Sequence, residues 1–102
     1  VLVQDVEWFG SAANYVVVNW AGREGLVREP LKTLEQRLDP RVFARAHRSS
    51  IVNLARVTEA TPLSDGSWRL LLKSGGDLIL SRTYRDGLLA RLGRPAGGAG
   101  RK

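Results

Sequence analysis

Short strand-forming runs, interrupted by turn residues every few positions, constrain the fold of this chain more than any other feature. The clearest run is Tyr15–Trp20, whose β-branched and aromatic residues are typical of a strand. Asp65-Gly66 and the run Ser74–Asp77 carry the glycines and small polar residues that join strands in hairpins. Because hairpins connect antiparallel strands, the pattern predicts a mainly β domain with antiparallel sheets.

We expect between about six and nine short strands and few helical turns. The predicted strands cover residues 1–9, with an irregularity near Asp5, and residues 15–20, 26–28, 51–54, 56–60, 68–73 and 78–80. Residues 10–14 are expected to form a loop, and residues 41–46 a short turn or helical segment.

Two short helices complete the predicted fold. The first lies near residues 30–38, where Pro30 suits a first helical turn and Asp39-Pro40 ends the helix. Its apolar face consists of Leu31, Leu34 and Leu38. A second, C-terminal helix is predicted with Thr83 as its N-terminal cap and with Tyr84, Leu88 and Leu92 on one face.

The size and composition of the chain exclude several classes of protein. Its 102 residues, 43% of them hydrophobic, correspond to one folded domain. The absence of Cys excludes disulfides, thiolate zinc sites and thiol nucleophiles, and a lone His47 excludes a histidine-cluster metal site. No apolar run approaches the ~20 residues of a membrane-spanning helix, and no cofactor is expected. We expect residues 1–93 to form the domain and residues 94–102 a disordered tail.

Positive charge is concentrated in the second part of the chain. Residues 1–40 carry four basic and six acidic side chains, a net charge of −2, whereas residues 41–102 carry twelve basic and four acidic ones, a net +8. Thirteen of the sixteen basic residues are Arg, which suits bidentate recognition of phosphate or guanine. A GC-rich genome produces the same bias, so charge alone suggests a polyanionic partner without establishing one.

Hydrogen-bond donors gather in two segments and at one further turn. The first segment runs directly into the apolar strand at residues 51–54 and comprises Arg45, His47, Arg48 and Ser49. The second, residues 81–85, lies at the start of the C-terminal helix, where free backbone N–H groups favour an anion. Asn14, at the end of the first loop, carries an amide suited to the edges of bases.

The first of these segments resembles the signature of LytTR DNA-binding domains, in the form Phe43-x-Arg45-x-His47-Arg48-Ser49-x-Ile51-Val52-Asn53. Supporting matches are Asp5-Val6-x-Trp8-Phe9, Asn14-Tyr15-Val16, Arg28-x-x-Leu31-x-x-Leu34-x-x-x-Leu38 and Leu80-Ser81-Arg82-x-Tyr84. Order and spacing agree from about Asp5 to Leu92. The chain departs from the family at Gly10, where Glu is frequent, at Ser50, where Tyr is frequent, and at Thr83, where some members have a basic residue.

The resemblance implies a bacterial, cytoplasmic transcription-regulating module built as an elongated stack of antiparallel β-sheets. Such domains usually follow the receiver domain of a two-component response regulator, and some are tethered to a membrane sensor. Their loops enter successive major grooves of double-stranded promoter DNA at paired direct repeats. The implied partners are therefore promoter DNA, an upstream receiver or membrane-sensor domain of the same chain, and a second copy of the domain on DNA.

The same resemblance assigns roles to individual residues. Arg48 is predicted to contact a base edge, bidentate to guanine, Arg82 a base or a phosphate, and Asn14 a base edge. The predicted phosphate contacts are Arg45, His47, Ser49, Thr83 and Arg85. Each of three residues also has a structural alternative. Arg48 could be a surface arginine paired with an acid, and Asn14 a turn residue that tolerates positive φ. His47 could be a histidine whose hydrogen bonds are satisfied within the fold. Asn53 is expected to be structural.

Two other function classes compete with DNA binding. An enzyme is not predicted, because the sequence lacks a paired-carboxylate motif, a Gly-rich phosphate loop and a G-x-S-x-G elbow. His47 and Ser49 share a face as a nucleophile pair would, but no acid lies nearby in the sequence to orient the imidazole. The alternative is a basic β-domain that binds RNA or a protein partner. Sheets that bind RNA expose aromatic residues among basic ones, whereas here the aromatic residues are expected to point inward, which favours duplex DNA.

Overall fold

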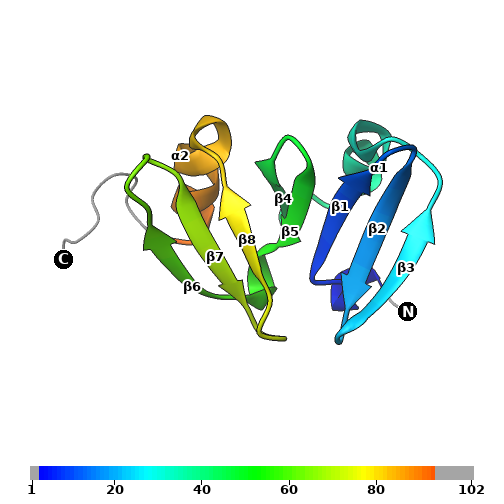
Figure 1. Ribbon diagram of the computed structural model, residues 1–102, viewed down its shortest axis with the longest axis horizontal. Coiled ribbons are helices and arrows are strands. Elements are labelled where there is room, and N and C mark those ends of the chain that lie inside the picture. Colours follow the sequence, from blue (N-terminus) through cyan, green and yellow to red (C-terminus); the bar gives the residue numbers. More distant parts are fainter. Residues whose placement is uncertain (1–2, 94–102) are drawn as a thin grey trace.

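The computed structural model describes residues 3–93, and within this range the chain is mainly β (Figure 1). The strands are β1 (Trp8–Ala12), β2 (Tyr15–Trp20), β3 (Arg23–Val27), β4 (Phe43–His47), β5 (Ser50–Asn53), β6 (Val57–Pro62), β7 (Trp68–Leu72) and β8 (Asp77–Leu80). The helices are α1 (Leu31–Arg37) and α2 (Arg82–Arg91), and short 3-10 turns occupy Val3–Asp5 and Leu54–Arg56.

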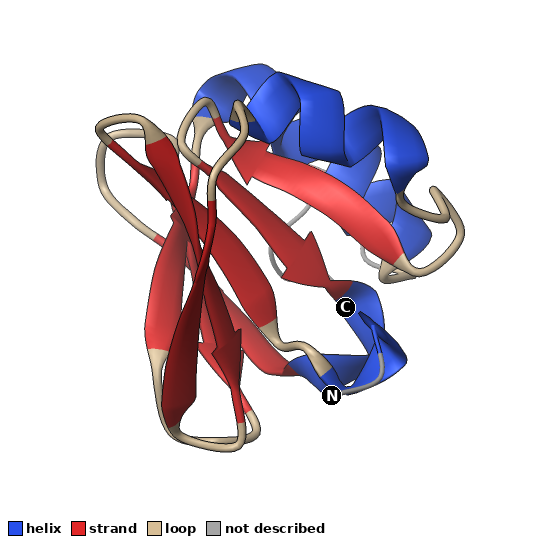
Figure 2. Cartoon of the chain, turned by 90° about the vertical axis from the view of Figure 1, so that its right-hand side faces the viewer, coloured by secondary structure: helices blue, strands red, loops and turns tan. Residues whose placement is uncertain are grey.

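The strands form two antiparallel sheets arranged along the long axis of the molecule. The larger sheet has the order β3-β2-β1-β5-β4 and the smaller one the order β6-β7-β8. Figure 2, a view along that axis, shows both helices on the same side of the strands. The molecule measures 41 × 23 × 23 Å. The predicted fold class is confirmed: an elongated stack of antiparallel sheets, with one short helix near residues 30–38 and another at the C-terminal end.

The β4–β5 hairpin is a wall shared by two hydrophobic cores. Phe43 and Ile51 point into the first core, beneath α1, together with Phe9, Val16, Leu31 and Leu34. Ala44, Ala46 and Val52 point into the second core, beneath α2, together with Leu70, Leu80 and Leu89. All four residues of β5 are buried, because successive side chains of a strand alternate between faces and both faces are covered here.

The N-terminal strand begins later than predicted and continues through the segment predicted as a loop. Residues 1–9 were expected to form a strand, but Val3–Asp5 is a 3-10 turn and β1 begins at Trp8. The predicted loop at residues 10–14 is wrong over its first half, because Gly10 pairs with β2 on one side and β5 on the other. A Cβ at Gly10 would lie 2.5 Å from Cζ3 of Trp8, so the indole ring occupies the space where a side chain would stand.

The prediction of a turn or helical segment at residues 41–46 holds for residues 41–42, which lie in a turn, and is wrong from Phe43 onward. Residues 43–47 form β4, although Ala and Arg have little preference for strands. Tertiary contacts outweigh this local preference, because β4 pairs with β5 and packs its alanines against α2 and β8. Alanine is the residue that fits where helix and sheet approach closely.

The ends of the helices and strands are fixed by main-chain and side-chain hydrogen bonds. Ser81, and not Thr83 as predicted, is the cap residue of α2, and Thr83 lies in the first turn. Asn53 has the structural role that its sequence position suggested. Its Nδ2 donates to the carbonyls of Gln4 and Val6 at 3.0 and 2.9 Å, and its Oδ1 accepts from the Ala55 N–H at 3.0 Å.

Two polar contacts join the sheets at opposite edges of the molecule. At one edge the Ser81 N–H donates to the Ala46 carbonyl at 2.8 Å, which ties the end of β8 to β4. At the other, the Glu7 carboxylate accepts hydrogen bonds from the Ser74 N–H at 2.8 Å and the Ser74 hydroxyl at 2.5 Å. Glu7 is buried, so its two charge-assisted bonds replace lost hydration and hold the β7–β8 turn against the larger sheet.

We predict that Ala21→Asn stabilises the domain by about 0.5–1 kcal/mol. Ala21 and Gly22 form the two-residue β2–β3 turn with φ values of +49° and +75°, the combination of a type I′ turn. Asn adopts this backbone region with less strain than Ala. Chemical denaturation measures the change. Gly22→Ala is the reverse control, expected to lose stability although no atom lies within 4 Å of the added Cβ. An unchanged or lower stability for Ala21→Asn would contradict the assignment of strain.

We predict that Glu7→Gln lowers the free energy of unfolding by about 1–3 kcal/mol, because the amide cannot accept both hydrogen bonds from Ser74 with the strength of a carboxylate. Glu59→Gln is the matched control. Glu59 is exposed on β6, and this change is expected to stay within about 0.5 kcal/mol of the wild type. Equal effects of the two substitutions in denaturation would show that the Glu7 contact adds nothing to stability.

Candidate nucleic-acid interface

Four connections that are distant in the sequence meet along one long edge of the molecule, here called the loop edge. They are the β1–β2 turn at residues 13–14, the β4–β5 tip at residues 47–49, the β6–β7 loop at residues 63–67 and the β8–α2 junction at residues 81–83. In Figure 1 all four lie along the top of the molecule, and the β2–β3 and β7–β8 turns lie at the bottom. The antiparallel order of the strands produces this arrangement, because alternate connections of such a sheet share an edge.

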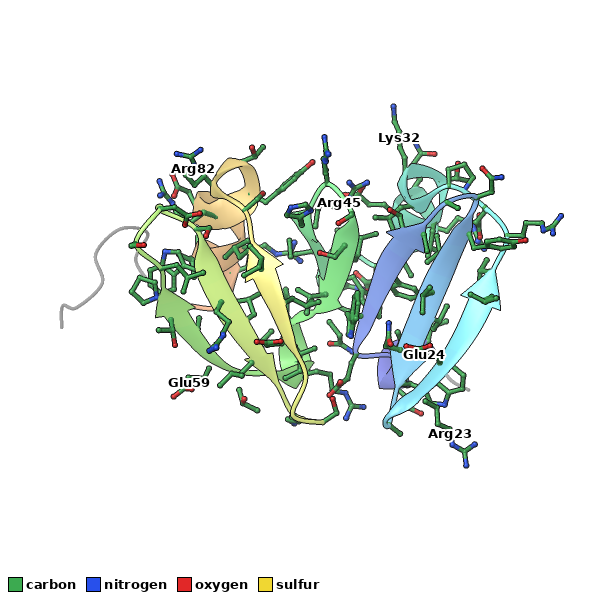
Figure 3. The ribbon with its side chains drawn as sticks, in the orientation of Figure 1. Arg23, Glu24, Lys32, Arg45, Glu59 and Arg82 are labelled. Carbon is green, nitrogen blue, oxygen red and sulfur yellow. The ribbon has the colours of Figure 1, made fainter. Side chains whose placement is uncertain are left out.

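Figure 3 shows how charged side chains are distributed over the two edges. Arg82, Arg45 and Lys32 lie along the upper part of the molecule, on three different elements. Arg23 and Glu59 lie toward the opposite edge. Basic side chains from α1, β4 and α2 therefore lie toward the loop edge, although their exposure differs.

The β4–β5 tip holds three of the predicted residues in a tight turn. Arg48 is exposed at its end. The Ser49 N–H donates to Nδ1 of His47 at 3.2 Å, and the Ser49 hydroxyl lies 2.9 Å from the same nitrogen. Since a backbone N–H can only donate, Nδ1 accepts, and the proton of the neutral ring lies on Nε2. The tip thus carries an exposed arginine and, at the preceding residue, a half-buried imidazole whose Nε2 is the donor.

The β8–α2 junction carries the second predicted cluster and is fastened to the β6–β7 loop. Arg82 and Thr83 are exposed on the first turn of α2. The aliphatic stem of Arg82 lies beside Gly66, since a Cβ on that glycine would lie 3.0 Å from Cδ of Arg82. Arg85 donates to the Gly66 carbonyl at 3.0 Å and pairs with Asp86 at 2.8 Å. Its guanidinium is therefore engaged in the fold, unlike the exposed Arg82.

One acidic side chain orders the β6–β7 loop from within. Asp65 accepts hydrogen bonds from the hydroxyl and the N–H of Ser67, at 2.5 and 3.0 Å. These bonds, helped by the positive charge of Arg82, hold the pKa of the Asp65 carboxyl below its ordinary value. The loop beside the basic cluster thus keeps its conformation at neutral pH, where this carboxylate is ionised.

The β1–β2 turn places the third predicted residue, Asn14, in an exposed position at one end of the loop edge. It follows Ala13, whose φ of +55° marks a tight two-residue turn. Next to it, Arg28 donates to the Tyr15 hydroxyl at 3.1 Å and lies 5.2 Å from the centre of the Tyr15 ring. Arg28 and Lys32 were not predicted as site residues. The pairing of β2 with β3 brings Arg28 to this edge, and Lys32 reaches it on α1 (Figure 3).

Arg45 occupies a different environment from the other predicted phosphate contacts. Its side chain is only 12% exposed and forms an ion pair with Glu35 at 2.9 Å. Its Nη1 donates to the Arg48 carbonyl at 3.1 Å. The structure therefore brings Arg45 close to the tip but directs its guanidinium into the fold.

Neither a metal centre nor a membrane-spanning helix is found in the described part of the chain. Residues 3–93 contain no group of three His, Asp or Glu side chains placed to hold a metal ion. No helix in the same range is long and apolar enough to cross a membrane.

Comparison with known proteins identifies the family. A model of the LytTr DNA-binding domain matches residues 1–93. The chain belongs to the LytTr DNA-binding domain family. Relatives include the sensory transduction protein LytT of Bacillus anthracis, 31% identical over 82 residues, which are 80% of this chain and 33% of that protein. The transcriptional regulatory protein BtsR of Escherichia coli K12 is 33% identical over 92 residues, 89% of this chain and 37% of that protein.

A solved structure supports the family assignment. It is the LytTr DNA-binding domain of a putative methyl-accepting/DNA response regulator from Bacillus cereus, with a TM-score of 0.84 and 25% identity. The match covers 91% of this chain and 85% of that one.

The chain spans about a third of the length of its LytT and BtsR relatives. The LytTR resemblance of the sequence is thus confirmed, and LytTr is not an enzyme family. The predicted tail at residues 94–102 lies outside the described residues and stays a prediction.

We predict that the neutral His47 ring carries its proton on Nε2. Long-range proton–nitrogen NMR correlation distinguishes the two ring nitrogens by their shifts. Ser49→Ala is expected to leave this tautomer unchanged, because the Ser49 N–H still donates to Nδ1. A ring protonated on Nδ1 in the wild-type protein would contradict the hydrogen-bond assignment at the tip.

Proposed function

We propose that this domain binds double-stranded promoter DNA sequence-specifically, as the DNA-binding part of a bacterial transcriptional regulator. The observation that carries the proposal is the loop edge, where Asn14, Arg48 and Arg82 are exposed on three separate connections. The long axis of 41 Å exceeds the ~34–36 Å of one turn of B-DNA. An edge of this kind suits loops that enter successive major grooves on one face of the duplex, at paired direct repeats.

In this proposal the three exposed side chains contact bases and their neighbours contact phosphates. Arg48 forms a bidentate pair with guanine, Arg82 contacts a base or a phosphate, and Asn14 contacts a base edge. The phosphate contacts come from His47 through Nε2–H, from Ser49 and from Thr83 in the first turn of α2. Arg85 contributes through Nη2, since its Nε and Nη1 bond to Asp86 and Gly66. Arg28, beside Tyr15, and Lys32 on α1 add positive charge at this edge and so add to its attraction for phosphates.

The proposed partners follow from the relatives, whose names refer to sensory transduction and transcriptional regulation. We propose that an upstream receiver or membrane-sensor domain of the same protein controls this domain in the cytoplasm. Two copies are proposed to bind neighbouring half-sites, because joining two weak sites raises affinity through effective concentration.

The alternative of an RNA-binding domain is less well supported by the distribution of aromatic residues. Phe43 and Trp68 are buried, and Tyr15, Trp8 and Tyr84 are half-buried against neighbouring elements. Stacking platforms for unpaired bases require aromatic faces exposed on a sheet. The exposed groups of the loop edge are instead hydrogen-bond donors at turns, which suit base edges and phosphates of a duplex.

We predict that selection from a random duplex-DNA library enriches a repeated motif, and that Arg48→Ala loses definition at one position of each half-site. The expected cost on the selected DNA is about 1–3 kcal/mol, with a much smaller cost on scrambled DNA. Arg23→Ala is the matched control, because Arg23 is an exposed arginine near the opposite edge (Figure 3). It removes the same charge and is expected to leave the motif intact.

Two results would contradict this proposal. Equal losses on selected and scrambled DNA for Arg48→Ala would remove Arg48 from the base contacts. A library without enrichment, with binding that only weakens as salt rises, would reduce the function to non-specific binding of polyanions. RNA and protein ligands would then be tested with the same variants.

A further inference from the structure

The Arg45 guanidinium lies between three elements that surround the base of the β4–β5 tip. One amino group, Nη2, pairs with Oε1 of Glu35 on α1 at 2.9 Å. The other, Nη1, donates to the carbonyl of Arg48 in the tip at 3.1 Å. The guanidinium carbon lies 6.0 Å from the centre of the Tyr84 ring on α2. One side chain thus contacts α1, the tip and α2 together.

This arrangement requires the shape of an arginine. The guanidinium is a rigid planar fork with two terminal nitrogens that point in fixed, different directions. One of them reaches Glu35 and the other the Arg48 carbonyl, so the two acceptors are held at a fixed separation. A lysine ammonium has the same charge but a single nitrogen on a flexible stem, and it cannot span both acceptors in this geometry.

The surroundings of Arg45 disfavour a direct role in DNA contact. Its side chain is 12% exposed, compared with 89% for Arg41, which lies just before the same strand. Both terminal nitrogens are already occupied, and Nε is buried without a partner. A phosphate would have to displace Glu35 to reach the guanidinium, and it would meet like charge there.

We propose that Arg45 is a positioning residue for Arg48, and that it sets where the Arg48 side chain enters the groove. The bond to the Arg48 carbonyl fixes the peptide from which that side chain projects, just beyond the irregularity in β4 between Arg45 and His47. The contact with Tyr84 relates this peptide to α2, whose first turn carries Arg82. The proposal rests on the proposed function, since Arg48 is taken to contact a base.

The experiment compares Arg45→Met with Arg41→Met in the same DNA-binding assay. Both variants remove one positive charge and keep an unbranched side chain, but Arg41 pairs with the nearby Asp39 and is exposed. Arg45→Lys retains the charge without the fork and serves if Arg45→Met fails to fold. Binding is measured at several salt concentrations on the selected DNA and on DNA changed at the position that Arg48 determines. Amide hydrogen exchange at residues 47–49 is measured without DNA.

We expect Arg45→Met and Arg45→Lys to reduce discrimination at that position between about five- and a hundred-fold, as Arg48→Ala does. The slope of log affinity against log salt should stay at the wild-type value, because no phosphate contact is lost. In the Arg48→Ala background, Arg45→Met should cause no further loss of discrimination. Exchange at residues 47–49 should become faster in the Arg45 variants and stay unchanged in Arg41→Met.

Other outcomes would overturn the proposal. A salt slope smaller by about 0.9, with equal losses on both DNAs, would show that Arg45 itself contacts a phosphate. Discrimination and tip exchange at wild-type values in both Arg45 variants would show that the tip keeps its position without Arg45. Wild-type protein that prefers no DNA sequence would contradict the proposed function, and hydrogen exchange alone would then decide whether Arg45 orders the tip.

Discussion

The burial of the β4–β5 hairpin on both faces is the constraint on which the rest of the structure depends. Phe43 and Ile51 on one face complete the core under α1, and Ala44 and Val52 on the other complete the core under α2. A slip of the hairpin by one residue would exchange these faces and place large side chains where only alanines fit. Register is therefore determined twice, once by each core. The tip of the hairpin, which carries Arg48, is fixed relative to both ends of the molecule.

Polar contacts between the two sheets help to define the angle between them. Apolar packing alone tolerates small rotations of one sheet against the other, whereas a buried hydrogen bond loses its strength within a few tenths of an ångström. Glu7 with Ser74 at one edge and Ser81 with Ala46 at the other restrict such rotation. Asn53 acts within the larger sheet, where its satisfied side chain ties the N-terminal segment to the end of β5. The same contacts help to set the spacing between the connections of the loop edge.

The sequence predicted those features that depend on local patterns and missed those that depend on tertiary contacts. The strand around Val16 and Val18, the helix with Leu31 and Leu34, and the turn at Gly66 follow from alternation, helical periodicity and turn residues. β4 was missed because its alanines and arginines favour a strand only when both faces are covered. Gly10 looked like a loop residue because the Trp8 ring that covers it cannot be inferred from a pattern.

In the candidate site, too, sequence motifs identified some residues, whereas others were identified only from their contacts in the structure. The motif at residues 43–53 and the match at residues 80–84 identified the two donor clusters and the family. The sequence predicted both Arg48 and Arg45 as DNA contacts, to a base and to a phosphate, and gave no sign that the Arg45 guanidinium is bonded within the fold. Only the pairing of Arg45 with Glu35 and the exposure of Arg48 distinguish them. Arg28 was also missed, because no sequence motif marks it as a site residue. The pairing of β2 and β3 brings it beside Asn14 in the structure.

A protein that recognises a groove with loops must limit the entropy that it loses on binding, since each backbone residue that becomes ordered costs about 1–2 kcal/mol. The loop edge meets this requirement with short, internally bonded connections. Asn14 is the second residue of a two-residue turn, the Ser49 N–H closes the tip by donating to His47, and Arg82 starts a helix. These turns, bonds and the helix start define the backbone, so in the proposed binding mode mainly side chains have to be immobilised. In the proposed binding mode, sequence specificity depends on side chains that project from backbone positions as well defined as those of a recognition helix.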